Sequence, residues 1–176
     1  MTVISEELHI EEYFYPLAKD YNPVFEFIIK ESTAAGTSPK GCFAKMSEWN
    51  IHHKHQSINK LIDWILTMTY SHFIQPFEDI TNVYPIKCSE TWGMSYDEGH
   101  YLKPHRHDPT QFSFVYYVNA PEGSSPLVFP SSGHEIKAEA GKVTIFESRL
   151  LHSVPPNQCK GRCAIVGNIV KHYYGD

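Results

Sequence analysis

The amino-acid sequence predicts a mainly β fold, built from two antiparallel sheets or a barrel and supported by helices. Two observations indicate this class. The second half of the chain contains five short runs rich in Val, Ile, Phe and Tyr, separated by Gly, Pro and Ser. The first half instead contains a run of apolar residues at helical spacing. A helix followed by a succession of strands is typical of an antiparallel double sheet or barrel.

Size and composition favour one domain spanning residues 1–176. The chain has 176 residues, of which 41% are hydrophobic, and this is ample for a core. The net charge is -5 and there is no sustained Lys/Arg stripe, so we expect no nucleic acid as the main partner. No stretch approaches the ~20 apolar residues that cross a bilayer, and the N-terminus is acidic. We therefore expect no membrane association, and a cytoplasmic protein with reduced cysteines.

The first half of the chain predicts one strand, one loop and one helix. The apolar run "PVFEFIIK" (23–30) predicts an edge strand, and "ESTAAGTSPKG" (31–41) predicts a flexible loop. From Ser57 onward, apolar residues recur close to helical spacing. A helix is therefore predicted over residues 56–75, ended by Pro76.

Five strands are predicted in the second half. They are "IKCSETWGMSY" (86–96), "QFSFVYYVNA" (111–120), "SPLVFP" (125–130), "KVTIFES" (142–148) and "RCAIVGNIVKHYY" (162–174). Each is short, rich in β-branched or aromatic residues, and bounded by turn-forming residues.

The segment "YLKPHRHDPTQFSFVYYV" (101–118) sets two histidines and an aspartate just before a strand. On a strand, His105 and His107 point to the same face with α-carbons ~6.5–7 Å apart. Both imidazoles can then reach one metal ion at ~2.0–2.1 Å. Asp108 would point to the opposite face unless a bulge rotates it. Since the chain has 11 histidines, this pair alone is weak evidence for a metal site.

The segment "GKVTIFESRLLHSVPPNQCKGRCAIV" supplies a third imidazole and a cation. His152 lies in the loop after one predicted strand, and Arg162 lies ten residues later on the next. A guanidinium is permanently charged and binds a carboxylate through two parallel hydrogen bonds. Taken separately, each residue would more often be structural. Taken together with the histidine pair, they predict a metal site with an anion clamp.

The elements "YDEGHYLKPHRHD", "VYYVNAPEGSSPLVFP" and "AGKVTIFESRLLHSVPPNQCKGR" resemble, in order, the core of the Fe(II)/2-oxoglutarate-dependent oxygenases. The resemblance is closest to the prolyl-hydroxylase-like branch and its small phage and bacterial members. It covers residues 92–170, with residues 1–91 as a supporting region. It implies a double-stranded β-helix, which is a cupin-like jelly roll. It also implies a dioxygenase that uses Fe(II), 2-oxoglutarate and O2 to hydroxylate a C–H bond of an unidentified prime substrate, with release of succinate and CO2.

The resemblance also assigns roles to individual residues. It implies that His105 and His152 bind iron and that Arg162 pairs with the distal carboxylate of 2-oxoglutarate. Tyr117 is implied to place its hydroxyl against the same carboxylate, and Tyr96 to line the cosubstrate pocket. The alternative for both tyrosines is ordinary strand packing. No catalytic residue beyond the metal centre is implied.

The chain departs from the family at one position, because the pattern HxD is here HxH. His107 replaces the carboxylate ligand, and iron would be held by three imidazoles. Period-two strand geometry favours His107 as the third ligand, with Asp108 as the alternative if the strand bulges. The substitution also keeps two other functions open, a cupin-like metal-binding domain and a three-histidine iron oxygenase that uses no 2-oxoglutarate.

Two further expectations concern the rest of the chain. The cluster "HHKH" (52–55) precedes the predicted helix without an acidic or cysteine partner nearby, so we expect it to be exposed and solvated. An aromatic-rich surface would suit a homodimer. The prime substrate is not indicated, because substrate pockets are built on loops whose positions the sequence does not show.

Overall fold

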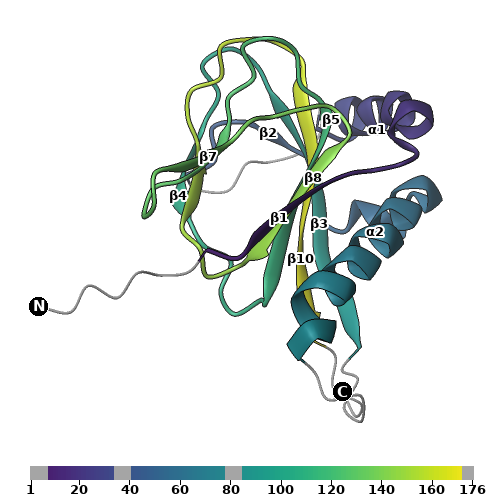
Figure 1. Cartoon of the computed structure of the whole chain (residues 1–176). Helices are drawn as coiled ribbons and strands as arrows, with labels where there is room; N and C mark the ends of the chain where they lie inside the picture. Colours follow the sequence, from purple (N-terminus) through teal and green to yellow (C-terminus); the bar gives the residue numbers. More distant parts are fainter. Residues whose placement is uncertain (1–7, 34–40, 78–84, 172–176) are drawn as a thin grey trace, which may run out of the picture.

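The computed structural model describes residues 8–33, 41–77 and 85–171 (Figure 1). Its helices and strands are β1 (Ile10–Phe14), α1 (Ala18–Thr33), β2 (Lys45–Met46), η1 (Ile51–His53), α2 (Gln56–Thr69), η2 (Tyr70–Ile74), η3 (Gln75–Phe77), β3 (Ile86–Tyr96), β4 (Leu102–His105), β5 (Phe112–Asn119), β6 (Leu127–Phe129), β7 (His134–Ile136), β8 (Lys142–Glu147), β9 (His152–Val154) and β10 (Arg162–Lys171). The predicted mainly β class is confirmed.

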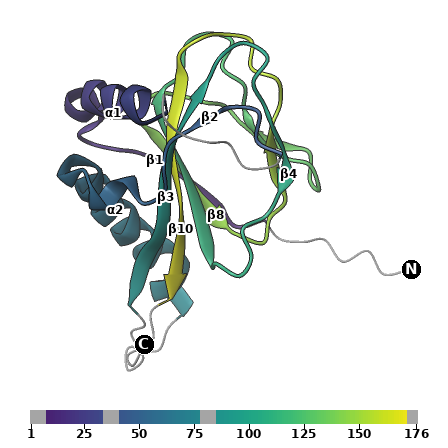
Figure 2. The same ribbon diagram turned by 180° about the vertical axis from the view of Figure 1, so that it is seen from behind.

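The strands form two antiparallel sheets. The larger sheet has the order β1-β8-β5-β10-β3-β2, and the smaller has the order β4-β9-β6-β7. Figures 1 and 2 show α1 and α2 on the outer side of the larger sheet, with β4 and β7 on its other side. This is a jelly roll with helical support, as predicted.

The central strands of the larger sheet are buried on both faces. In β5, the side chains of Phe112 and Tyr116 pack with the helices, while those of Val115 and Tyr117 pack between the two sheets. Successive side chains point to opposite faces of a strand, so both sets must be apolar. This explains why the strands appear in the sequence as continuous apolar runs. The inner face of the sheet forms one wall of the functional site.

The prediction of an edge strand at residues 23–30 is wrong, because this run lies in α1. Phe25, Ile28 and Ile29 are spaced three and four residues apart and form the buried face of the helix. Close packing of α1 on the sheet depends on Gly93 of β3, since a Cβ there would lie 2.9 Å from Cγ1 of Ile29. The first edge strand of the larger sheet is instead β1, which pairs with β8. The predicted loop is also wrong at residues 31–33, which form the last turn of α1, and residues 34–40 lie outside the described residues.

The other sequence-predicted elements are found in the structure. The helix predicted over residues 56–75 is α2, and two further helical turns, η2 and η3, extend it to Phe77 with Pro76 in the last turn. The five predicted strands correspond to β3, β5, β6, β8 and β10. Residues 172–174 of the last predicted strand lie outside the described residues. Within the described ranges, no helix is both long enough and apolar enough to cross a bilayer.

Candidate metal centre and anion pocket

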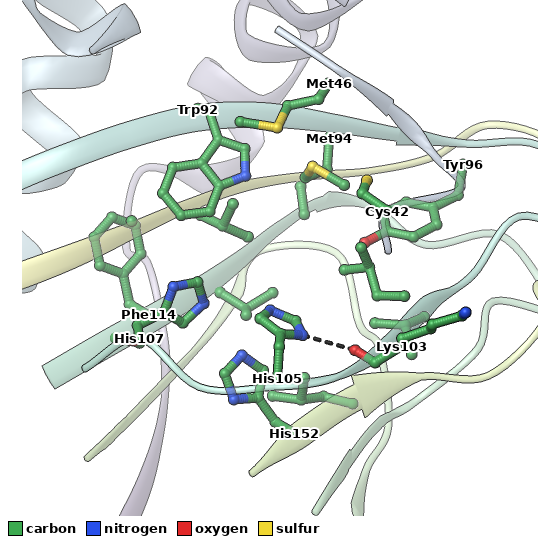
Figure 3. A pocket seen from close by; sticks show the side chains of 18 of the residues that line it. Cys42, Met46, Trp92, Met94, Tyr96, Lys103, His105, His107, Phe114 and His152 are labelled. Atoms are coloured by element: carbon green, nitrogen blue, oxygen red, sulfur yellow. Dashed lines mark hydrogen bonds between the residues drawn. The ribbon is translucent and has the colours of Figure 1, made fainter. Parts of the chain in front are cut away.

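Three imidazoles meet at the edge of the smaller sheet. His105 at the end of β4 lies directly opposite His152, which is the first residue of β9 and not in a loop as predicted. His107 follows β4 by two residues, so the strand predicted to carry both His105 and His107 ends before His107. Each of the three offers one ring nitrogen, and these nitrogens lie within 4.8 Å of one another. The ring centroids are 4.3 to 5.1 Å apart. Figure 3 shows the three rings converging on one side of a cavity, and together they could hold a metal ion.

Backbone carbonyls determine which nitrogen of two of these rings is free. Nδ1 of His105 lies 2.8 Å from the carbonyl oxygen of Lys103, and Nδ1 of His152 lies 2.8 Å from that of Leu150. A carbonyl can only accept a hydrogen bond, so Nδ1 donates in both rings. In each neutral ring, Nε2 therefore carries the lone pair that a metal would bind.

Burial keeps two of the imidazoles neutral. Burial, with the neighbouring His105 as the second cause, lowers the pKa of His152 to about 3 and that of His107 to about 4. Both rings are consequently uncharged at pH 7. Neutral imidazole is the form that binds metal, so protons compete little for this site at neutral pH.

Asp108 does not join the three imidazoles. It lies in a turn that the backbone N–H of Thr110 closes by donating to the carbonyl of His107 over 3.0 Å, and its side chain is exposed. The structure thus brings His107, and not Asp108, to His105 and His152. The identity of the third metal ligand is still a prediction, now with this geometry in favour of His107.

The backbone of His107 is held from two sides. Its N–H donates to the carbonyl of Ser148 over 3.0 Å, and its carbonyl accepts from the hydroxyl of Thr110 over 2.6 Å as well as from that residue's N–H. The Thr110 hydroxyl also lies 2.8 Å from that of Ser148. These contacts attach His107 to the end of β8.

A buried row of polar side chains continues from Ser148 across the larger sheet. The Ser148 and Ser113 hydroxyls are 2.8 Å apart, Ser113 donates to Oδ1 of Asn168 over 2.9 Å, and Nδ2 of Asn168 donates to Glu90 over 3.0 Å. The Glu90 carboxylate fixes the orientation of the Asn168 amide, because only the amide nitrogen can donate to it. Ser113 must then donate to Asn168 and accept from Ser148. From Ser148 to Glu90, each hydrogen bond of the row thus has one donor and one acceptor. The contact between Ser148 and Thr110 joins the row to the segment that carries His107.

Arg162, the first residue of β10, is buried and has no charge partner within the described part of the chain. It is 1% exposed and lies opposite Tyr96 of β3. Its guanidinium carbon is 4.1 Å from the centroid of the Tyr96 ring and 5.6 Å from that of Tyr117. Among the described residues, neither Nε nor Nη1 has a hydrogen-bond partner. A buried cation without an anion is costly, so this group is suited to bind a ligand carboxylate.

The three imidazoles and the guanidinium of Arg162 share one cavity of about 480 Å³. The three histidines, Arg162 and Tyr96 line it, and much of the remaining wall is apolar. No Asp or Glu is among the described residues that line it. A volume of this size is typical of small-molecule sites. The cavity can therefore hold a metal ion and an anionic ligand together.

No family model matches the chain, and no curated protein matches it. The structure matches the collagen prolyl hydroxylase of Paramecium bursaria Chlorella virus-1 in its 2OG complex, with a TM-score of 0.69 and 19% identity over 91% of this chain and 94% of that chain. A Pseudomonas putida prolyl-4-hydroxylase matches with a TM-score of 0.67 and 16% identity over 93% of each chain. A Burkholderia pseudomallei oxidoreductase of the 2OG-Fe(II) oxygenase family matches with a TM-score of 0.63 and 14% identity over 92% and 84%. The chain has the fold of the 2OG-Fe(II) oxygenases.

Within this oxygenase fold, the two tyrosines singled out from the sequence differ in position. Tyr96 lines the cavity, whereas Tyr117 lies beside Arg162 behind the lining residues, and its hydroxyl has no partner among the described residues. Burial raises the pKa of Tyr96, and it raises that of Tyr117 to about 12 against the opposing effect of Arg162. Both hydroxyls are therefore protonated at neutral pH and can donate hydrogen bonds.

The sequence did not single out Thr144 of β8. Its hydroxyl is fully buried and lacks a partner among the described residues, as does that of Tyr117. Unpaired buried polar groups are rare, so the Tyr117 hydroxyl beside the guanidinium of Arg162 indicates a missing polar ligand, and Thr144 lies next to that hydroxyl. The signal in the sequence was one polar residue within the apolar run "VTIF" (143–146).

The prediction of an exposed cluster at residues 52–55 is wrong for His52. That side chain is buried, and its Nδ1 lies 2.6 Å from the hydroxyl of Thr91 on β3. Burial lowers the pKa of His52. Its role in the oxygenase fold is to attach the segment before α2 to the larger sheet, and His53 is exposed as predicted.

Proposed function

We propose that the chain is an Fe(II)- and 2-oxoglutarate-dependent dioxygenase that hydroxylates a C–H bond, with release of succinate and CO2. The observation that carries this proposal is the buried, unpaired guanidinium of Arg162 in the same cavity as three metal-competent imidazoles. A purely structural metal site has no need of a carboxylate clamp. A dicarboxylate that also reaches the metal accounts for both features.

The residues present fit the metal. His105, His107 and His152 would hold it through three neutral nitrogen donors, a set that suits Fe(II) among other transition metals. Three ligands leave other coordination positions open for ligands from solution. Fe(II), when bound, would activate O2, which is the oxidant; 2-oxoglutarate would supply two of the four electrons that O2 accepts, and the hydroxylated C–H bond would supply the other two.

The chain's own residues would bind and orient the cosubstrate. Arg162 would hold its distal carboxylate, with one face of the guanidinium lying against Tyr96. The hydroxyls of Tyr117 and Thr144, which lack partners among the described residues, would donate to the same carboxylate. The apolar wall of the cavity would exclude water from the reacting groups.

The all-imidazole ligand set favours a second candidate, an iron oxygenase that uses no 2-oxoglutarate. Compared with the two-histidine, one-carboxylate set, three neutral ligands leave the bound metal one unit more positive. Such a centre could bind its substrate directly to the metal. The two candidates differ in their need for Arg162, which only the first explains.

Anaerobic titration of the Fe(II)-loaded protein with 2-oxoglutarate tests the proposal. A metal-to-ligand charge-transfer band in the visible spectrum is expected as the keto acid chelates iron. Arg162→Ala should shift the titration to higher 2-oxoglutarate concentration, by at least about tenfold, with iron affinity unchanged. Arg149→Ala is the control, because that guanidinium is exposed and paired with Glu147.

Two results would contradict the proposal. One is an Arg162→Ala protein that binds 2-oxoglutarate as tightly as the wild type. The other is iron binding without a charge-transfer band, together with oxygen consumption that does not depend on 2-oxoglutarate, and this would select the second candidate.

A further inference from the structure

We propose that the prime substrate presents a planar, unsaturated ring, in a group without positive charge, to a corner of the cavity formed by Trp49, Trp92, Met46 and Met94. The inference rests on the proposed function, because only an oxygenase would have this ligand as its prime substrate. It goes beyond that function by assigning the substrate a chemical class and a binding surface.

The corner is made of two indoles and two thioethers. The ring centroids of Trp49 and Trp92 are 4.6 Å apart with their planes at 60°, and both residues line the cavity. Met46 of β2 pairs with Met94 of β3, and both of these line it too. Figure 3 shows Trp92 and the two methionines on one side of the cavity, facing His105 and His152. A ligand in the corner would therefore face the imidazoles.

The corner adjoins the candidate metal centre. The ring centroid of Trp92 lies 5.9 Å from that of His107. A ring held against Trp92 would place its substituents next to the three imidazoles. This is the position that a substrate C–H bond must reach for hydroxylation at the metal.

Trp49 is exposed yet held in place. Its side chain is 49% exposed. On one side of it, the N–H of Ser47 donates to the carbonyl of Gly93 over 2.9 Å, and on the other, the N–H of Asn50 donates to that of Thr91 over 2.6 Å. Both acceptors lie on β3. A large apolar side chain that is fixed at a cavity wall, with half its surface uncovered, is suited to contact a ligand without further ordering.

Charge around the corner excludes cations. The charged side chains among the described lining residues are Lys103 and Arg162, apart from the titratable histidines. Of the carboxylates near the Trp49 segment, Glu48 pairs with Lys54 at 2.6 Å and Asp97 pairs with Lys45 at 3.0 Å. Glu90, two residues before Trp92 on β3, accepts a hydrogen bond from the Asn168 amide over 3.0 Å and is not among the lining residues. A bound divalent metal ion and the 2-oxoglutarate dianion would offset each other in charge, so the net positive charge of the lining comes from Lys103 and Arg162. A cationic substrate would thus find no carboxylate among the described residues that line the cavity.

The composition of the corner favours an unsaturated ring over a saturated one. Inclined indoles let one ring stack on the first and present its edge to the second, and both are favourable aromatic geometries. Thioether sulfurs also make favourable contacts with aromatic rings. A saturated ring of the same size would bury similar area but gain neither effect.

Matched ring compounds test the inference on the zinc-loaded protein with 2-oxoglutarate, because Zn²⁺ is redox-inactive. The probes are phenylacetate (anionic), 2-phenylethanol (neutral), 2-phenylethylammonium (cationic) and cyclohexylacetate (saturated). The readout is the indole N–H signal of each of the three tryptophans in nitrogen–proton correlation spectra. Trp64 of α2, which packs against Tyr15 at 5.1 Å, is an internal control. Single Trp→Phe variants assign the signals.

Saturable shifts of the Trp49 and Trp92 signals are expected with phenylacetate and 2-phenylethanol, with the Trp64 signal unmoved. Cyclohexylacetate and 2-phenylethylammonium should bind at least about threefold more weakly than phenylacetate. Trp49→Ala should weaken phenylacetate binding about threefold to tenfold, and Trp49→Phe should weaken it less. Phe27→Ala, which removes an exposed ring from α1, should change nothing.

Equal affinity for the cationic and anionic probes would overturn the inference. Unchanged affinity in Trp49→Ala, or no shift of the Trp49 signal with any ring compound, would overturn it as well. Calorimetric titration of 2-oxoglutarate in the same samples separates the two proposals. If 2-oxoglutarate fails to bind while phenylacetate still shifts Trp49, the oxygenase function fails and the corner stands as a ring-binding site.

Discussion

His105 and His152 lie directly opposite each other on β4 and β9, and each donates from Nδ1 to a carbonyl two residues earlier in the chain. The same local contact on two paired strands points both Nε2 lone pairs at one place. The backbone thus fixes two donors of the candidate metal centre before any metal binds. The third donor depends on the chain after β4, where the sequence offers both His107 and Asp108.

Substitution of these two residues tests which one binds the metal. His107→Ala should lower Fe(II) affinity at least about 100-fold. Loss of a contact that only orients a ligand costs about 10- to 100-fold in metal affinity, and loss of the ligand itself should cost more. Asp108→Asn should leave the affinity within about twofold, since this side chain is exposed. Anaerobic competition with a chromogenic chelator measures both values. The reverse pattern would make Asp108 the ligand.

The depressed pKa values of His107 and His152 predict that the metal-free protein loses stability in acid. The unfolded chain protonates both rings near pH 6.5, whereas the folded chain holds them neutral down to about pH 4 and pH 3. Between these limits the unfolded state binds more protons, so the free energy of unfolding falls as pH falls, by about 1.4 kcal/mol per pH unit for each proton. Urea unfolding at pH 7.5 and pH 5.0 measures the difference. A His107→Gln/His152→Gln protein should show a shallower dependence, and an equal slope would contradict the assignment.

Much of the fold could be predicted because the strands carry local signals. β5 and β8 are rich in β-branched and aromatic residues and are bounded by turns, and their burial on both faces makes the apolar runs nearly continuous. The run in α1 has equally strand-like residues, and only the spacing of Phe25, Ile28 and Ile29 indicated a helix. Propensity was overridden there by packing against the sheet.

The candidate site could be predicted only in part, because the sequence shows local patterns but not contacts between residues that are far apart in the chain. The spacing of His105 and His107 is a local pattern, and the structure brings both to His152. The burial of His52 depends on Thr91, 39 residues away, and no local pattern shows it. Thr144 stands out only once its unpaired hydroxyl is known to lie in a buried site.

Gly93 is predicted to be required for the packing of α1. Gly93→Ala would place a Cβ 2.9 Å from Cγ1 of Ile29, so the helix must shift, at a cost of about 1–3 kcal/mol. Ile29→Ala removes the obstructing atom, so the double variant should be less destabilised than the sum of the single variants. Denaturant unfolding of the four proteins measures this coupling. Strict additivity would show that the contact does not limit the packing.

The polar row behind His107 is predicted to control metal affinity. Ser113→Ala interrupts the row between Ser148 and Asn168 and leaves both with an unsatisfied group. Fe(II) affinity should fall about tenfold, the lower range for loss of a contact that orients a ligand. Thr69→Val is the matched control, because it removes a buried hydroxyl that donates to the carbonyl of Ile65 in α2. If both variants lose similar stability and neither loses metal affinity, the row is structural only.

Tyr117 and its neighbour Tyr116 on β5 should respond in opposite ways to loss of the hydroxyl. The Tyr117 hydroxyl is buried and has no hydrogen-bond partner in the described parts of the chain, so Tyr117→Phe should raise the stability of the ligand-free protein by about 1 kcal/mol. If that hydroxyl donates to 2-oxoglutarate, the same change weakens cosubstrate binding roughly two- to tenfold. Tyr116 donates to Asn22 at 2.5 Å on the helix side of the sheet, so Tyr116→Phe should lower stability and leave cosubstrate affinity unchanged.

Thermal unfolding and calorimetric titration of 2-oxoglutarate on the same samples measure both effects. Thr144→Val should follow Tyr117→Phe in both, because its hydroxyl is also buried without a partner among the described residues. If Tyr117→Phe gains stability and its affinity for 2-oxoglutarate is unchanged, Tyr117 does not bind the carboxylate, and Arg162 holds it without this hydroxyl. Lost stability would mean that the hydroxyl is already satisfied in the ligand-free protein, since only an unsatisfied buried group is better removed than kept.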